Sequence, residues 1–290
     1  MDTLLTIATP TYNRAYTLTA CYESLCAQTD QRFVWMVIDD GSTDNTEKMI
    51  DKWIEDNRIR ILYLKKSNGG KASALNVGIG KMNTKYATCL DSDDTFFPDA
   101  VGLALEELER YCSEPDCCGV LALRNNPDGS VMGEKTIPNE MIRVTAADIF
   151  LKLKLETELI CFYKTEILKK YRFPEFEGEK FVSPAWMQYT VTQKYYFRTS
   201  WNKICSCQYI EDGLTKNKKK VIKKNPKGYL CVKKYSFNLA PSLGLRIKHG
   251  IIYDYGCILS KNDNWLEGVD HKILAIVLRP LARVIYFSRK

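Results

Sequence analysis

The first half of the chain alternates between short apolar runs and longer segments with helical periodicity. Runs typical of buried strands lie at Leu4–Ala8, Val34–Ile38, Ile59–Leu64, Tyr86–Leu90 and Gly119–Leu123. Between them lie segments that favour helices, at Ala15–Gln28, Thr43–Glu55, Lys71–Gly80 and Asp99–Tyr111. Because strands and helices alternate, the pattern predicts βαβ crossovers. We therefore expect an α/β fold with a mostly parallel sheet flanked by helices.

The pattern becomes irregular after a turn at residues 125–130, which contains Asn, Pro, Asp and Gly. We expect residues 1–125 to form one half of a catalytic domain and residues 126–215 the other half. A lysine-rich run, Lys216 to Lys227, predicts a linker, so residues 216–290 are expected to be a basic linker and a helical tail.

The tail ends in an apolar run at residues 273–287 that contains two arginines and a proline. A membrane-spanning helix needs roughly twenty apolar residues, so this run is too short to span a bilayer. Two interpretations remain open. The run can be a helix packed on the catalytic domain, or an interfacial helix that binds an anionic membrane beside the basic residues.

Two acidic clusters follow predicted strands. Asp39 and Asp40 follow one strand, and Asp91, Asp93 and Asp94 follow another. The carboxyl ends of parallel strands are where open α/β sheets bind ligands. Carboxylates crowded there repel one another unless a cation offsets the repulsion, so the pattern predicts a divalent cation, Mg²⁺ or Mn²⁺, with a phosphate ligand.

Each acidic cluster, taken singly, is also typical of an ordinary turn or helix cap, and two further segments change that interpretation. Thr9-Pro10-Thr11-Tyr12-Asn13 follows the first strand. Asn68-Gly69-Gly70-Lys71 is a glycine-rich turn that opens a helix with a lysine at its start. A helix N-terminus with a nearby cation favours anions.

With these four segments, in this order, the chain resembles the family 2 glycosyltransferases of the GT-A fold. The resemblance covers about residues 1–125. It implies an inverting transferase that moves a sugar from a nucleotide diphosphate, expected to be a UDP-sugar, to a hydroxyl of a glycan or lipid-linked acceptor. By the same resemblance, the expected pathway is bacterial surface polysaccharide synthesis.

The resemblance also implies roles for individual residues. Asp91 and Asp93 would handle the ribose and the metal, with Asp93 as the more direct ligand and Mn²⁺ or Mg²⁺ as the cofactor. Pro10, Tyr12 and either Asp39 or Asp40 would hold the nucleoside, with Lys71 near the donor. The whole set expected to bind the donor is Pro10, Tyr12, Asn13, Asp39, Asp40, Lys71, Asn76, Asp91 and Ser92.

Inversion by direct displacement needs a general base for the attacking hydroxyl. Both histidines, His249 and His271, lie in the tail, so a carboxylate is expected. The acidic, aromatic loop at residues 173–181 offers Glu179 and Glu177. Relatives place the base in this part of the chain as a pair of acids, which Glu179-Lys180 matches only in part. A second acidic turn, Glu211-Asp212, is either part of a mobile lid over the diphosphate or a plain turn.

Composition narrows the remaining possibilities. The eleven cysteines are scattered and odd in number, which favours free thiols in a reducing cytosol. Cys205-Ser206-Cys207 lacks the spacing of a zinc site. No basic, apolar leader begins the chain, so we expect a cytoplasmic protein, peripheral at the inner face of the membrane if the tail binds lipid.

Two other classes of protein would share some of these features. A nucleotidyltransferase also uses paired aspartates, but a basic glycine-rich loop would be expected where Thr9–Asn13 stands. A non-catalytic basic module that binds nucleic acid or membrane would use the lysines, with aromatics such as Tyr195, Tyr196 and Phe197. Such a module has no need of acidic strand ends, so no nucleic-acid partner is expected.

Overall fold

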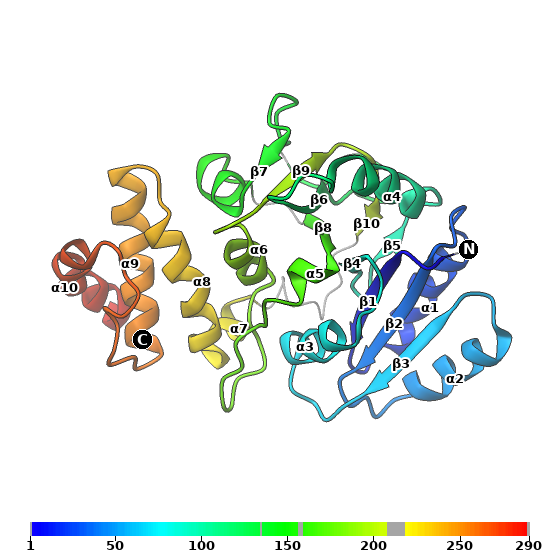
Figure 1. Cartoon of the computed structure of the whole chain (residues 1–290). Helices are drawn as coiled ribbons and strands as arrows, with labels where there is room; N and C mark the ends of the chain where they lie inside the picture. The colour runs from blue at the N-terminus through cyan, green and yellow to red at the C-terminus, as the bar shows by residue number, and fades with distance from the viewer. Residues whose placement is uncertain (1, 134, 156–158, 208–217, 289–290) are drawn as a thin grey trace.

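The computed structural model describes residues 2–133, 135–155, 159–207 and 218–288. Within these ranges the main sheet has eight strands in the order β3-β2-β1-β4-β8-β6-β9-β7 (Figure 1). Their bounds are β1 Leu5–Thr11, β2 Phe33–Asp39, β3 Ile61–Lys65, β4 Tyr86–Cys89, β6 Cys117–Leu123, β7 Arg143–Val144, β8 Leu159–Lys164 and β9 Tyr196–Ser200. A separate antiparallel pair joins β5, Thr95–Phe96, to β10, Cys205–Ser206.

Four helices follow the predicted segments of the first half to within a few residues: α1 Ala15–Cys26, α2 Thr46–Asp56, α3 Lys71–Lys81 and α4 Ala100–Tyr111. Among its described residues, the second half contains a short π-helix and two short helices, η1 Asp148–Lys152, α5 Thr165–Leu168 and α6 Ala185–Val191. The C-terminal region is helical, with α7 Lys218–Lys224, α8 Pro226–Asn238, α9 Leu243–Leu259 and α10 Lys272–Ser288.

Helices cover both faces of the sheet, because successive strand residues point to opposite sides. Along β2, Trp35 and Val37 pack with α1, α2 and α4, whereas Met36 and Ile38 pack with α3, α5 and α6. This arrangement explains why the strands are apolar without interruption, as the sequence indicated. The α/β expectation is confirmed.

The sheet is parallel through β3-β2-β1-β4 and mixed beyond that point. β8 lies between β4 and β6 and runs antiparallel to both, although about seventy residues separate it from β4 along the chain. The expected boundary between residues 125 and 126 therefore falls within a single continuous sheet, and the two expected halves share one core.

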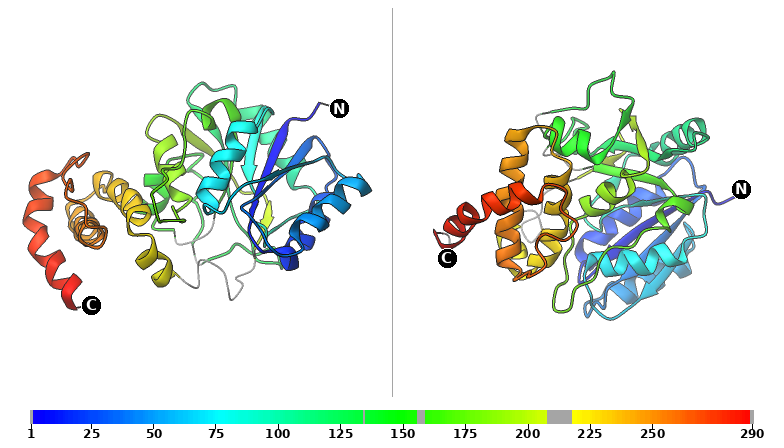
Figure 2. Two further views of the ribbon diagram at one scale, coloured as in Figure 1. Left: turned by 90° about the horizontal axis from the view of Figure 1, so that it is seen from below. Right: turned by 60° about the vertical axis from the view of Figure 1, so that its left-hand side comes forward.

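The lysine-rich run was expected to be a linker, and this expectation needs correction where the structure describes it. Residues 218–224 form α7, and Pro226 starts α8. Lysine is a good helix former. Proline suits the first position of a helix because an N–H at that position would have no acceptor within the helix. Helices α8, α9 and α10 form one end of the molecule (Figure 2), with α8 packed against α6. No described helix is both long and apolar enough to cross a bilayer.

Candidate active site

The carboxyl ends of β1, β2 and β4 meet at one edge of the sheet, as their parallel pairing requires (Figure 1). β1 ends at Thr11, β2 ends at Asp39, and Asp91 lies two residues beyond β4. The acidic clusters, which are about fifty residues apart in sequence, are therefore brought to the same edge.

Asp39 is fully buried at the end of β2. Its Oδ1 accepts a hydrogen bond from the backbone N–H of Ser42 at 2.7 Å, and its Oδ2 accepts one from the Tyr63 hydroxyl at 2.7 Å. These bonds satisfy the buried carboxylate and hold the turn that follows β2. A contact between Asp39 and a nucleoside stays a prediction.

Asp40 anchors the glycine-rich turn. Its Oδ1 accepts from Lys66 Nζ at 2.8 Å and from the Gly69 N–H at 2.9 Å, and its Oδ2 accepts from the Gly70 N–H at 2.6 Å. Gly70 has a φ of 90°, and a Cβ there would lie 1.8 Å from the carbonyl oxygen of Lys180. Only glycine allows the turn and the loop around Lys180 to approach so closely.

The loop after β1 is tied to the loop after β2. Asn13 has a φ of 52°; its N–H donates to Ser42 Oγ at 2.9 Å, and its Oδ1 accepts from the Thr43 N–H at 2.7 Å. Pro10 is buried in β1, whereas Tyr12 has 47% of its surface exposed. Tyr12 is therefore the group of this loop that is open to a stacking partner.

Three carboxylates and two cations converge beyond β4. Oxygens of Asp91, Asp93 and Asp94 lie within 4.8 Å of one another. Lys71, the first residue of α3, places Nζ 2.5 Å from Asp91 Oδ1. The Arg124 guanidinium lies 3.5 Å from Asp91 Oδ2 and forms a short ion pair with Asp94.

The charges in this cluster shift the carboxyl pKa values in different directions. Burial alone would raise the pKa of Asp91, but attraction by Lys71 and Arg124 outweighs it and lowers that pKa. Burial and the Asp91 charge raise the pKa of Asp93. Burial also raises the pKa of Asp94, with Arg124 acting in the opposite direction. Asp91 is thus held as an anion by the protein itself.

Arg124 belongs to this cluster although no motif in the sequence singled it out. It follows β6 directly and is 8% exposed. Its Nε donates to the carbonyl oxygen of Leu159 at 3.2 Å, which fixes the guanidinium against β8. The available signal was a charged residue at the end of an otherwise apolar strand, where a buried charge needs a partner.

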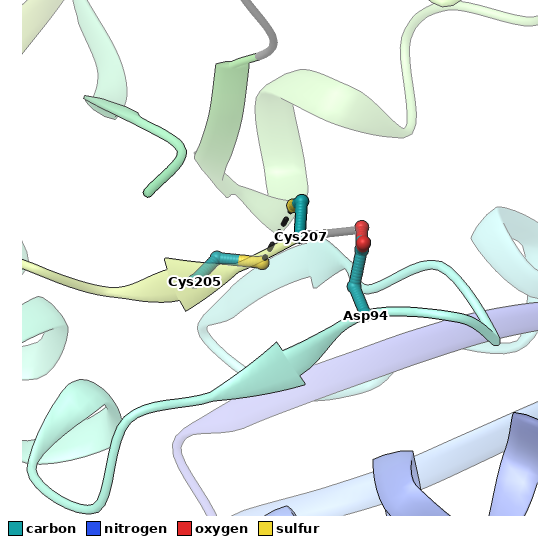
Figure 3. A group of neighbouring side chains, drawn as sticks. All are labelled: Asp94, Cys205 and Cys207. Atoms are coloured by element: carbon teal, nitrogen blue, oxygen red, sulfur yellow. Dashed lines mark hydrogen bonds between the residues drawn. The ribbon is translucent and has the colours of Figure 1, made fainter. Parts of the chain in front are cut away.

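Two thiols lie beside this ion pair. Cys205 and Cys207 have their sulfurs 3.7 Å apart and form a close group with the Asp94 carboxylate (Figure 3). The spacing of the cysteines gave no indication of this group, because only the pairing of β5 with β10 brings Asp94 to them. Arg124 contacts both Asp94 and the Cys207 sulfur, so a cation already balances the buried carboxylate.

The predicted general base lies in the loop before α6. Glu179 accepts hydrogen bonds from the backbone N–H groups of Lys227 at 2.9 Å and Gly228 at 2.8 Å, at the start of α8. A carboxylate in this position is stabilised by the positive end of the helix dipole and in turn stabilises the start of α8. Glu177 is exposed. The choice between them stays a prediction. The second acidic turn, Glu211-Asp212, expected to be a lid over the diphosphate or a plain turn, lies outside the described residues.

The same loop faces the glycine-rich turn. Lys180 donates its N–H to Asn225 Oδ1 at 2.7 Å, and its ammonium group binds the side chain of Asn68. A cavity of about 240 Å³ lies between loop and turn, and its lining includes Gly69, Ser73 and Glu179. The candidate base thus shares a cavity with the turn that begins α3.

Asn76 and Ser92, two further predicted donor-binding residues, are less accessible. Asn76 donates to the Phe173 carbonyl oxygen at 2.9 Å and to Glu175 Oε1 at 2.8 Å, and it accepts from the Phe173 N–H at 2.8 Å. These bonds attach α3 to the loop. Ser92 is buried between the acids. Donor contacts by both residues stay predictions.

Solved structures with the same fold include glycosyltransferases. S. aureus TarS residues 1–349 in complex with UDP superimposes with a TM-score of 0.58 over 98% of this chain and 88% of that one, at 18% identity. A Pyrobaculum calidifontis mannosyltransferase in complex with GDP-Man and Mn²⁺ gives 0.57 over 99% and 83%, at 15% identity. At these identities the likeness shows the GT-A fold.

Sequence comparison agrees with the fold. Glycosyltransferase GlyG of Streptococcus pneumoniae is 34% identical over 131 residues, which are 45% of this chain and 42% of that protein. The chain therefore matches less than half of the length of this curated relative. The family model described as Glycosyl transferase family 2 matches residues 6–172, more than half of the chain. The chain belongs to glycosyl transferase family 2.

Proposed function

We propose that this protein is an inverting glycosyltransferase. It moves a sugar from a nucleotide diphosphate, expected to be a UDP-sugar, to a hydroxyl of a glycan or lipid-linked acceptor in bacterial surface polysaccharide synthesis. The convergence of Asp91, Asp93 and Asp94 with Lys71 and Arg124 beyond β4 carries this proposal. Family membership and the UDP bound to TarS support it, and neither favours a nucleotidyltransferase or a non-catalytic module.

A divalent metal fits this site by the chemistry of its donors. Lys71 and Arg124 engage Asp91, and Arg124 engages Asp94, whereas no described residue forms an ion pair with Asp93. Carboxylate oxygens suit Mg²⁺ and Mn²⁺. Asp93 would be the direct ligand, with Asp91 as the second. When bound, the metal would offset the charge of the donor diphosphate.

The residues of the chain supply the remaining functions in this proposal. The exposed ring of Tyr12 stacks on the nucleoside base, beside the buried carboxylate of Asp39. Lys71 orients Asp91 and adds a positive charge near the phosphates at the N-terminus of α3. Glu179 or Glu177 takes the proton from the acceptor hydroxyl as its oxygen bonds to the anomeric carbon, while the bond from that carbon to the nucleotide diphosphate breaks and the diphosphate leaves.

The place of action is also part of the proposal. A lipid-linked acceptor lies at the inner face of the cell membrane, so a cytoplasmic enzyme that uses one would bind there peripherally. The basic C-terminal region supports this placement, since each basic residue near an anionic surface contributes about 1 kcal/mol to attachment.

Donor turnover tests the proposal. Purified protein is incubated with a panel of UDP- and GDP-sugars in Mn²⁺, in Mg²⁺ and in chelator, and release of the nucleotide is measured. We expect metal-dependent release with one nucleotide class. Asp93→Ala should lower turnover by several orders of magnitude, because it removes the carboxylate proposed as the direct ligand of the metal.

Asp116→Asn is the matched control, because Asp116 is an exposed acid on the loop before β6. It should keep wild-type turnover. Near-normal turnover of Asp93→Ala in Mn²⁺ would contradict the assignment of Asp93 as the metal ligand. Absence of nucleotide release from every donor, with and without oligosaccharide acceptors, would contradict the transferase proposal itself.

A further inference from the structure

Helix α10 has a second apolar face that no described residue covers. One face packs on α9 through Ala275, Leu278 and Ala282, which are buried. Large apolar side chains elsewhere on the same helix are at least 48% exposed, namely Ile273, Ile276, Val277, Leu281, Val284 and Phe287.

The exposed side chains form a continuous stripe. At about 100° of rotation per residue, the six positions fall within an arc of about 140° on the side opposite Ala275 and Ala282. Four of them, Ile273, Val277, Val284 and Phe287, are between 65% and 80% exposed. Monomeric proteins rarely expose a contiguous apolar patch of this kind without a partner.

The charges of α10 indicate which partner this is. The helix contains Lys272, Arg279 and Arg283 and no acidic residue. Arg279 is turned inward, 3.5 Å from Asp254 on α9 and stacked over the ring of Trp265. Lys272 and Arg283 are exposed and lie along one edge of the apolar stripe.

We propose that the exposed face of α10 docks in the surface of an anionic lipid bilayer. Ile273, Val277, Val284 and Phe287 enter the region between headgroups and acyl chains, while Lys272 and Arg283 bind lipid phosphates. Figure 2 shows α10 at the outer end of the molecule, where a flat surface can reach it. The helix lies in the interface and does not cross the membrane.

This inference deepens the peripheral placement given under the proposed function, and it rests on that function only for the identity of the acceptor. Docking along α10 would hold the sheet edge with Asp93 at a fixed distance from the membrane surface. It would also raise the local concentration of a lipid-linked acceptor.

Vesicle co-sedimentation of the full chain tests the proposal. Vesicles of phosphatidylcholine with phosphatidylglycerol are compared with vesicles of phosphatidylcholine alone, at low salt and at about 0.5 M salt, where charges are strongly screened. Wild-type protein should bind the anionic vesicles at low salt and lose most of this binding at high salt. The double variant Val277→Ser with Val284→Ser should bind at least about tenfold more weakly.

The matched control is Ile54→Ser with Ile142→Ser, which removes two exposed apolar side chains far from α10. This control should bind as the wild type does, and Arg283→Glu should weaken binding only to anionic vesicles. Asp93→Ala should bind normally, so a failure of sugar transfer remains distinguishable from a failure of docking.

Three outcomes would overturn the proposal. One is wild-type protein that ignores anionic vesicles at low salt. Another is a Val277/Val284 double variant that binds as the wild type does. The third is a wild-type dimer in light scattering that the same double variant converts to monomer without any effect on vesicles, which would make a second copy of this chain the partner.

Discussion

Lys71 and Asp91 form an ion pair between the start of α3 and the loop after β4, with Nζ 2.5 Å from Oδ1. Both side chains are mostly buried, so the pair is screened less than one on the surface. It attaches the glycine-rich turn to the acidic run, two segments that the sequence assigns separately to phosphate and metal. Lys71 thereby orients the Asp91 carboxylate, whereas no described residue forms an ion pair with Asp93.

Glu179→Gln distinguishes two roles for Glu179. If the carboxylate is the base, turnover should fall by roughly a hundredfold or more while donor affinity stays, because glutamine keeps the size but cannot accept the proton. If it only caps α8, the free energy of unfolding should fall by about 1 kcal/mol and turnover should stay near normal. Turnover, donor binding and thermal unfolding of one preparation separate these results.

Glu177→Gln is the natural companion variant, because Glu177 lies in the same loop and is exposed. Little effect on turnover is expected from it. A loss confined to Glu177→Gln would move the base two residues earlier in the loop.

Arg124→Met should be strongly destabilising. It leaves Asp94 without its buried cation and Asp91 with Lys71 as its remaining cation, and breaking a buried pair from one side costs roughly 3–5 kcal/mol. Arg124→Lys should recover part of this loss, since it restores the charge without the planar fork that contacts two carboxylates. Denaturant unfolding of both variants measures the difference, and Arg110→Lys on the exposed side of α4 serves as the control.

The Arg124→Lys variant also reports on function. If Arg124 positions the acids, this variant should show weaker Mn²⁺ dependence of turnover even where it is folded. If Arg124→Met has the stability and the metal dependence of the wild type, the hypothesis that Arg124 positions the carboxylates is wrong.

Gly70→Ala should impair the glycine-rich turn. The added Cβ would meet the carbonyl oxygen of Lys180 at 1.8 Å, and φ at this position is 90°, where side chains are strained. We expect a loss of at least about 1–3 kcal/mol in unfolding free energy and weaker donor binding. Gly244→Ala is the control, because nothing lies within 4 Å of its added Cβ in the first turn of α9. Equal effects of the two changes would contradict this account.

The stability of the α9–α10 contact should depend on pH through Asp254. Burial raises the pKa of Asp254 to about 6 in the folded state, with Arg279 acting in the opposite direction. Because the folded-state pKa is above the unfolded value, the native state holds more protons between about pH 4 and pH 6. The stability of the wild type should therefore fall as pH rises through this window, by at most about 3 kcal/mol.

Asp254→Asn removes this titration. The difference in unfolding free energy, Asp254→Asn minus wild type, should increase from about pH 4 to pH 6 and then level off. Asp263→Asn, at an exposed site between α9 and α10, should show no such trend. A flat difference across the window would mean that the Asp254 carboxyl titrates normally.

The local pattern of residues was enough to determine the first half of the fold. Apolar runs with helical segments between them predicted β1 to β4 and α1 to α4, because burial on both faces of a parallel sheet leaves a strong sequence signal. The acidic residues after β2 and β4 and the turn before Lys71 were identified for the same reason, since strand ends and helix starts are local features.

Contacts between distant segments could be decided only by the tertiary structure. The insertion of β8 between β4 and β6 brings Arg124 to Asp91 and Asp94, and no spacing in the sequence encodes that meeting. The same holds for Glu179, which the fold places on the N-terminus of α8 about fifty residues later in the chain. Charge pairing acts through space, so it depends on strand order rather than on neighbours along the chain.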